Sequence, residues 1–218
     1  MTIKPPETPP EIGPLTAGLV HDFNNLLLAM TACLELIRGR STEARIIDIA
    51  THGLSTLDRG TQLVDRLMTV ARDRPAAAAA DAAAPETAAD PVERQSAILV
   101  VDDDADVRLV LVELLRSLGY RLIEAADGPT GIAAADREQP DLAIIDYALP
   151  GLNGGEVVAE LRRQRPDLPV IFATGYSDPD GLDPRWRHLP ILRKPFRIAD
   201  LARTVAAALR ERNRTTSP

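Results

Sequence analysis

The sequence predicts two folded parts of different classes: an α-helical hairpin, followed by a doubly wound α/β domain with a five-stranded parallel sheet. In the first third of the chain, apolar residues recur at steps of three and four, which is typical of helices. In the second half, short apolar runs alternate with helical stretches, which is typical of parallel sheets. Between the two parts lies a segment of alanine, proline and small acidic residues that has no apolar periodicity.

The first helix is expected over residues 15–38. Its apolar positions follow one another at steps of 4, 3, 4, 3 and 4, which predicts a coiled-coil-like seam. The seam residues are Leu19, Phe23, Leu26, Met30, Cys33 and Ile37. Gly39 is a natural C-terminal stop, and Ser41 or Thr42 can cap the helix that follows.

The second helix is expected to carry an apolar stripe at the same spacing. The stripe consists of Ile47, Ala50, Leu54, Leu57, Thr61, Val64, Met68 and Ala71. A second stripe at Leu63, Leu67 and Val70 widens the apolar face. Two helices alone cannot bury so wide a face against each other. We therefore expect the hairpin to form a homodimer, a four-helix bundle.

The expected organisation has five segments. Residues 12–73 form the hairpin, 74–96 an alanine- and proline-rich linker, and 97–212 the α/β domain. Residues 1–11 and 213–218 are expected to be disordered. An extension of the second helix into the alanine run is the alternative for the first few linker residues.

The strands of the sheet are predicted from five short apolar runs, at 97–101, 121–125, 142–146, 169–174 and 190–193. Helices are predicted at 105–118, 129–138, 154–165 and 197–212. Right-handed crossovers then leave few topologies. Residues 177–188 are too rich in proline, glycine and aspartate for a full helix, so we expect a degenerate fourth crossover.

Composition excludes several classes of protein. The formal charge of −7 argues against nucleic-acid binding through a bulk positive field. Cys33 is the only cysteine, so neither an intrachain disulfide nor a cysteine-based zinc site can form. No apolar run approaches the roughly 20 residues that span a bilayer, and the proline-rich N-terminus does not look like a signal peptide. We expect a cytoplasmic protein with no direct contact to nucleic acid or membrane.

Polar side chains follow the predicted strands where chemistry collects in such sheets, at their carboxyl ends. They are Asp102 and Asp103 after the first strand, Asp146 after the third, Thr174 after the fourth and Lys194 after the fifth. Three clustered carboxylates repel one another unless a cation balances them, and hard oxygen ligands suit Mg²⁺. A carboxylate beside that ion can attack phosphorus, and Lys194 and Thr174 can stabilise charge on the phosphoryl oxygens.

Residues 97–212 resemble the receiver domain of response regulators, which has a flavodoxin-like fold. The matching motifs are VVDD (100–103), IIDYALPGLNG (144–154), FATG (172–175) and LRKPF (192–196). The sequence departs from the family at Ile191, where an aromatic residue is common. The ring-flip version of the family's switch is therefore not implied.

The resemblance implies a role for each site residue. Asp146 would be the phosphoacceptor, Thr174 the switch hydroxyl and Lys194 the salt-bridge partner of the phosphate. Asp103 would bind Mg²⁺ directly and Asp102 through water. The backbone carbonyl of Ala148 would complete the protein's ligands.

The first helix carries a histidine, His21, which is predicted to lie on the face opposite the apolar seam. His21 lies about 160–200° around the helix from Leu19 and Phe23, and Asn25 follows one turn later on the same face. The segment LTAGLVHDFNNLLLAM (15–30) resembles the H-box of histidine kinases, particularly hybrid kinases that carry a receiver, and LVDRLMTVAR (63–72) resembles the end of that module's second helix. The resemblance implies that His21 is a phosphoacceptor, Asp22 its acid/base partner, and Asn25 a residue that positions water to dephosphorylate a docked receiver.

No asparagine box, glycine-rich ATP lid or P-loop occurs in the sequence, so ATP-dependent kinase activity is not expected. His–Asp phosphotransfer and receiver autodephosphorylation remain open as activities. We expect a phosphorelay protein whose partners are a sensor histidine kinase, another response regulator, or both. Two alternatives are a receiver-only regulator with the hairpin as a dimerisation scaffold, and a phosphatase-type bundle that acts on a receiver.

Overall fold

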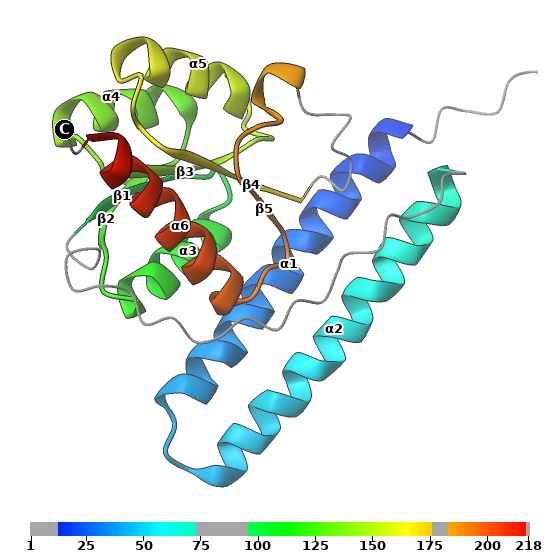
Figure 1. Cartoon of the computed structure of the whole chain (residues 1–218). Coiled ribbons are helices and arrows are strands. Elements are labelled where there is room, and N and C mark those ends of the chain that lie inside the picture. The colour runs from blue at the N-terminus through cyan, green and yellow to red at the C-terminus, as the bar shows by residue number, and fades with distance from the viewer. Residues whose placement is uncertain (1–12, 73–95, 176–182, 217–218) are drawn as a thin grey trace, which may run out of the picture.

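The computed structural model describes residues 13–72, 96–175 and 183–216. Within helices, the side chains of residues 13–21, 64–72 and 215–216 are outside the described part. The linker predicted at 74–96, apart from Ser96, and the predicted N-terminal segment 1–11 also lie outside it. A long two-helix hairpin stands beside a compact α/β domain (Figure 1).

The hairpin consists of α1 (Gly13–Arg40) and α2 (Ala44–Arg72), which run side by side (Figure 1). α1 continues through Gly39 and ends at Arg40, and the hydroxyl of Ser41 accepts a hydrogen bond from the Glu43 amide at 3.2 Å. The core between the helices contains the buried residues Leu27, Ala50 and Leu54. These contacts confirm a helical hairpin.

The α/β domain alternates strands and helices as predicted. Its elements are β1 (Ala97–Val101), α3 (Ala105–Ser117), β2 (Arg121–Ala125), α4 (Gly128–Glu138), β3 (Leu142–Asp146), α5 (Gly154–Gln164), β4 (Val170–Thr174), the 3₁₀ turn Pro184–Trp186, β5 (Ile191–Arg193) and α6 (Ile198–Thr216). All neighbouring strands pair in parallel, in the order β2-β1-β3-β4-β5. This confirms the predicted doubly wound sheet.

The three central strands, β1, β3 and β4, are buried on both faces, because helices cover both faces of the sheet (Figure 1). Side chains alternate between the faces. Ile98 and Val100 of β1 pack in a cluster with α3 and α6, whereas Leu99 and Val101 pack in a second cluster with α4 and α5. This explains why the strands read as continuous apolar runs.

The fourth crossover agrees with the prediction, whereas the last helix is longer than predicted. In the fourth crossover the described residues hold only one 3₁₀ turn, in agreement with the expected degenerate helix, and Trp186 from this turn joins the α4–α5 cluster. Residues 176–182 of that crossover lie outside the described part. α6 extends to Thr216, four residues beyond the predicted end of the domain, and only residues 217–218 of the expected tail remain undescribed.

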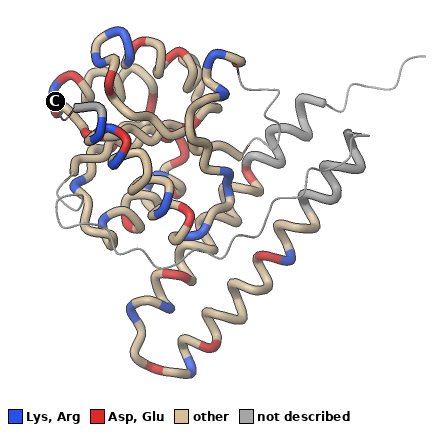
Figure 2. Tube along the Cα trace, viewed as in Figure 1, with Lys and Arg blue, Asp and Glu red and all other residues tan. Residues whose placement is uncertain are grey.

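None of the described helices combines the length and the apolar character needed to cross a membrane. Charged residues are spread over the helices of the α/β domain, whereas long stretches of the hairpin carry none (Figure 2).

The α/β domain packs on the hairpin through α1 and α3 (Figure 1). Leu28 and Ala32 of α1 belong to the same buried cluster as Val107 and Leu111 of α3. The face of α1 opposite the seam, with Asn25 and Leu28, is therefore covered by the α/β domain.

The seam predicted on the opposite side of α1 is exposed in the single chain. Phe23, Leu26, Met30 and Ile37 are 43–56% exposed, and Cys33 is also exposed. An apolar face of this kind is what the prediction of a four-helix bundle requires, but its partner is not part of the structure.

Gly154 offers a test of how α5 begins. A Cβ atom at this position would lie 2.4 Å from the carbonyl oxygen of Asp146 and 2.8 Å from the Cα of Tyr147, both backbone atoms. We expect Gly154→Ala to lower the free energy of unfolding by about 1–3 kcal/mol, because the loop after β3 must move.

Gly60→Ala is the matched control. A Cβ atom there meets nothing within 4 Å, in the interior of α2. Alanine should raise the free energy of unfolding by about 0.5–1 kcal/mol through its higher helix propensity. Chemical denaturation of both variants checks the prediction, and a stable Gly154→Ala protein would contradict it.

Candidate functional site: an acidic pocket at the strand ends

The polar residues predicted at the strand ends meet at one edge of the sheet. Asp102 and Asp103 follow β1, Asp146 ends β3, Thr174 ends β4 and Lys194 follows β5. They come together because parallel neighbouring strands place their carboxyl ends on the same side. All five residues therefore lie at one edge of the sheet.

Three carboxylates form the centre of this site. Asp102, Asp103 and Asp146 each offer an oxygen, and these oxygens lie within 4.8 Å of one another. Asp102 and Asp146 are each 1% exposed, whereas Asp103 is open to solvent. The amide of Ala148, in the loop after β3, donates a hydrogen bond to Oδ1 of Asp146 at 3.1 Å.

Lys194 is the cation inside the pocket. Its Nζ donates to Oδ2 of Asp102 at 2.8 Å and to Oδ2 of Asp146 at 2.7 Å, and its side chain is buried. Its backbone amide donates to the carbonyl of Thr174 at 2.8 Å, which holds the end of β5 against the end of β4. One ammonium against three carboxylates leaves a formal charge of −2.

The electrostatics reflect this imbalance. Burial raises the pKa of Asp102 to about 6, and the neighbouring Asp146 adds to the rise, although Lys194 opposes it. Burial disfavours the charge of Lys194, but Asp146 and Asp102 outweigh that effect and raise the pKa of the lysine. The ammonium is therefore retained, and the three carboxylates still lack two positive charges.

The pocket fits Mg²⁺. Its ligands are hard oxygens, its excess charge matches a divalent cation, and the exposed Asp103 leaves one side open to water. Bound there, Mg²⁺ would neutralise charge on a phosphoryl group beside Asp146. Asp102, Asp103 and Asp146 are the side chains that would hold the ion.

Two asparagines of α1 contact the rim of the pocket. The side-chain amide of Asn25 donates to Oδ2 of Asp104 at 3.0 Å, and that of Asn24 donates to the carbonyl of Gly175, next to Thr174, at 3.0 Å. Both asparagines are about 5% exposed or less. The hairpin therefore reaches the strand ends.

The histidine predicted as phosphoacceptor belongs to the same helix. His21 lies in α1 one turn before Asn25, and its side chain is outside the described part. The neighbouring Asp22 is exposed. The structure therefore brings Asn24 and Asn25 of this helix to the rim of the pocket and does not describe the imidazole of His21.

The sequence did not single out Asn24 or the double role of Asp104. Asp104 caps α3, because its Oδ1 accepts from the amides of Asp106 and Val107, while its Oδ2 accepts from Asn25. An aspartate at the start of a helix predicts the cap. Nothing in the spacing of residues predicts the contact between distant parts of the chain.

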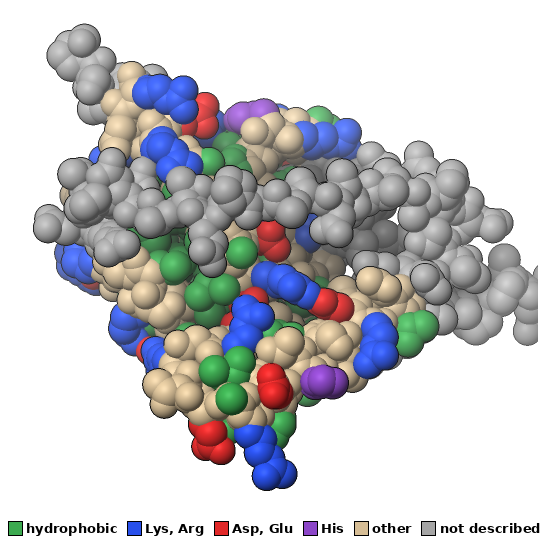
Figure 3. Space-filling view, turned by 60° about the horizontal axis from the view of Figure 1, so that its bottom comes forward, with side chains coloured by type: hydrophobic (Ala, Val, Ile, Leu, Met, Phe, Trp, Pro, Cys, Tyr) green, Lys and Arg blue, Asp and Glu red, His purple; other side chains and the backbone are tan. Residues whose placement is uncertain are grey.

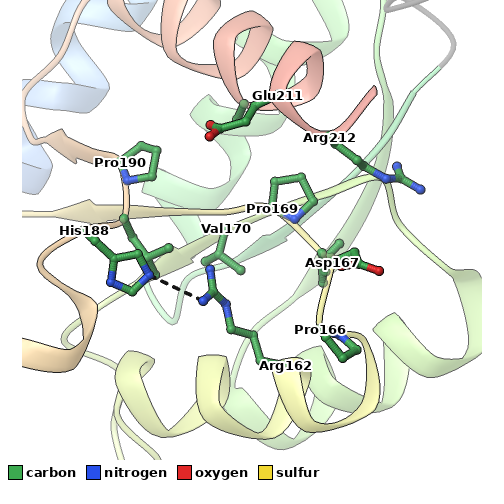
Figure 4. A pocket seen from close by; sticks show the side chains of 12 residues that line it. Arg162, Pro166, Asp167, Pro169, Val170, His188, Pro190, Glu211 and Arg212 are labelled. Atoms are coloured by element: carbon green, nitrogen blue, oxygen red, sulfur yellow. Dashed lines mark hydrogen bonds between the residues drawn. The ribbon is translucent and has the colours of Figure 1, made fainter. Parts of the chain in front are cut away.

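A second hollow lies at the opposite edge of the sheet, where β4 and β5 begin (Figure 4). It has a volume of about 210 Å³ between the ends of α5 and α6. Arg162 points toward His188 there, with Nη1 3.5 Å from Nε2 (Figure 4). Because the acidic residues lie at the other ends of the strands, this hollow is no part of the acidic pocket.

The raised pKa of Asp102 gives opposite pH effects on stability and on metal binding. Without metal, the folded protein holds the Asp102 proton more tightly than the unfolded chain. The stability that protonated Asp102 contributes is therefore lost as the pH rises from about 4 through about 6. Mg²⁺ competes with that proton, so we expect Mg²⁺ affinity to fall about tenfold per pH unit below pH 6.

Calorimetric titration with Mg²⁺ at about pH 7.5 and about pH 5 measures this effect. Asp102→Asn is the control, because it removes the titrating group and should flatten this part of the pH profile. Equal affinities of the unsubstituted protein at both pH values would contradict the prediction.

Residues 98–206 match the profile of the response regulator receiver domain family. Among curated proteins, the probable transcriptional regulatory protein TcrX of Mycobacterium tuberculosis is 34% identical over 124 residues, which are 55% of this chain and 52% of TcrX. PdtaR of the same species, a transcriptional regulatory protein, is 33% identical over 116 residues, 51% of this chain and 56% of PdtaR. The chain thus spans about half the length of these relatives.

Solved structures give the same result. A CheY-like receiver domain protein from Methanospirillum hungatei is 27% identical, with a TM-score of 0.52, and covers 56% of this chain and 98% of its own. A receiver domain protein from Clostridium thermocellum is 25% identical, also with a TM-score of 0.52, over 56% of this chain and 99% of its own. Through residues 98–206, behind an N-terminal helical hairpin, this chain belongs to the response regulator receiver domain family.

Proposed function

We propose that the chain is a two-component phosphorelay protein whose receiver accepts a phosphoryl group on Asp146 and whose hairpin exchanges that group through His21. The observation that carries the proposal is the docking of α1 at the acidic pocket. Asn25 bonds to Asp104 and Asn24 to Gly175, at the rim of the pocket. Residue 21 shares a helical face with Asn25, one turn closer to the N-terminus.

The chemistry follows from the residues of the pocket. A carboxylate oxygen of Asp146 attacks the phosphorus of a phosphohistidine, the P–N bond breaks, and the imidazole leaves with the electron pair and takes up a proton. Asp22 serves as the acid/base partner of His21. The Lys194 ammonium and the Thr174 hydroxyl bind the phosphoryl oxygens.

Asp103 and Asp146 would hold Mg²⁺ directly, Asp102 would do so through water, and the backbone carbonyl of Ala148 would complete the protein's ligands. The exposure of Asp103 supports its role as a direct ligand, because Asp102 and Asp146 are both buried and bonded to Lys194.

The partners are proteins that carry the same chemistry. A sensor histidine kinase supplies the phosphoryl group, or another response regulator exchanges it with His21. The curated relatives are named transcriptional regulators, but we propose no direct contact of this chain with nucleic acid. Its net charge is −7, and basic and acidic side chains are interspersed on the face in Figure 3.

We also propose that the hairpin forms a homodimer. The support is the exposed apolar seam of α1, together with the exposed Ile46, Ile49 and Leu63 of α2. A second copy would bury both faces in a four-helix bundle. The docked receiver leaves this side of α1 open, because it covers Asn25, Leu28 and Ala32 instead.

Acetyl phosphate tests the phosphorelay, because it can phosphorylate an aspartate without a kinase. With Mg²⁺ and acetyl phosphate, the full chain should acquire a base-labile phosphate on Asp146 and an acid-labile phosphate on His21. Mass spectrometry can map both. His21→Ala should keep only the first, and Asp146→Asn should lose both, because the phosphoryl group reaches His21 through Asp146.

His52→Ala is the matched control, since His52 is an exposed histidine of α2 and should leave both labels unchanged. An aspartyl phosphate without any phosphohistidine would contradict the relay. Asn25→Ala then separates the remaining functions. A longer lifetime of the phosphate on Asp146 would indicate a phosphatase-type hairpin, and an unchanged lifetime a dimerisation scaffold.

The dimer is tested by placing charge on the exposed seam. Met30 is 46% exposed in the single chain, so Met30→Glu should be tolerated by the fold but should disfavour burial against a second copy. Sedimentation equilibrium should show a shift from dimer toward monomer. Leu109→Glu, at a 58% exposed position of α3, should leave the mass unchanged. A monomeric unsubstituted protein would contradict the proposal.

A further inference from the structure

The last helix of the receiver, α6, is preceded by a residue whose side chain cannot accept a hydrogen bond from the helix start. Arg197 precedes α6, and its guanidinium has donors but no acceptor. The free amides at a helix start need an acceptor. The amide of Ile198 finds one in the hairpin: it donates to Oε2 of Glu35 at 2.7 Å, across 163 positions of the sequence.

Glu35 is a buried acid, only 6% exposed. Burial raises the pKa of this carboxyl, against the Ile198 amide and the positive charges of Arg38 and Arg197, which lower it. Withdrawing a carboxyl group from water is unfavourable unless it is hydrogen-bonded. The contact with Ile198 therefore selects one position of α6 relative to α1, since a small shift would leave the carboxylate buried without that bond.

The same turn of α6 is also bound by the second helix of the hairpin. Arg197 forms an ion pair with Asp58 of α2, and both side chains are about half exposed. Exposed ion pairs contribute little to stability. A hollow of about 230 Å³ between Thr31, Gln62 and Pro195 separates α2 from the receiver next to this pair. The buried Glu35 bond is therefore the stronger of the two polar contacts.

We infer that Glu35 is the docking residue that holds the receiver on the hairpin of its own chain, by capping α6 from the neighbouring helix. The apolar contacts around Leu28, Ala32 and Phe196 supply buried apolar surface, and Glu35 sets the orientation of α6 relative to α1. The face formed by α3 and the start of α6 is thereby reserved for the chain's own hairpin. A separate histidine-bearing protein has to displace that hairpin to reach the same face.

Amide hydrogen exchange of the full chain tests this inference at the bonded atom. Glu35→Ala should speed exchange of the Ile198 amide by about tenfold or more, because a hydrogen bond to a charged group is lost. Glu35→Gln should stay close to the unsubstituted protein, since the side-chain carbonyl can still accept. Glu43→Ala, at an exposed glutamate in the hairpin turn, should change nothing.

The fold of the receiver is followed separately through Trp186, the only tryptophan, which is buried in the α4–α5 cluster. Its fluorescence during denaturation should be the same in all four proteins. Unchanged exchange at Ile198 in Glu35→Ala would overturn the inference. So would faster exchange that extends through β1 and β3, because Glu35 would then stabilise the whole receiver rather than its docking. Neither measurement involves phosphate, so failure here is distinct from failure of the relay.

Discussion

The central constraint on this molecule is a charge imbalance that the fold itself creates. Parallel strands bring carboxylate oxygens of Asp102, Asp103 and Asp146 to within 4.8 Å of one another, and the buried Lys194 neutralises only part of their negative charge. Repulsion between like charges destabilises the fold strongly in a site from which water is largely excluded. The pocket is tolerable to the fold because a divalent cation can complete it, and the same unbalanced charge makes it suitable for phosphoryl chemistry.

The second determinant of the structure is the way in which the hairpin meets the receiver. α1 has two faces with apolar residues. One is covered by α3 and the start of α6, and the other is exposed. The covered face also carries polar residues that bond at both ends of the contact, Asn24 and Asn25 near the strand ends and Glu35 at α6. This combination of apolar area and buried polar bonds is typical of a specific interface.

The sequence predicted the elements of the sheet within one or two residues at most boundaries, because each strand is a short apolar run bounded by polar residues or turns. It also predicted which side chains cluster, since parallel topology decides where the strand ends lie. What it could not supply was the partner of α1. The spacing of Leu19 through Ile37 indicates an apolar seam, but the opposite face mixes apolar Leu28 with polar Asn25 and Glu35, and this mixture does not identify what the face contacts. Its burial depends on contacts more than 75 residues away along the chain.

The two carboxylate oxygens of Asp104 accept hydrogen bonds from different parts of the chain, and this has a thermodynamic consequence. One oxygen fixes the first turn of α3, and the other accepts from Asn25 of the hairpin; Asp104 itself lies two residues after Asp102 of the acidic pocket. The loop that carries Asp102 and Asp103 is thus hydrogen-bonded to the docked hairpin through Asp104. A ligand of the pocket that binds more tightly when this bond is formed must also favour docking, by the same amount of free energy that docking lends to the ligand. Loading of the pocket and docking of the hairpin would then report on one shared equilibrium.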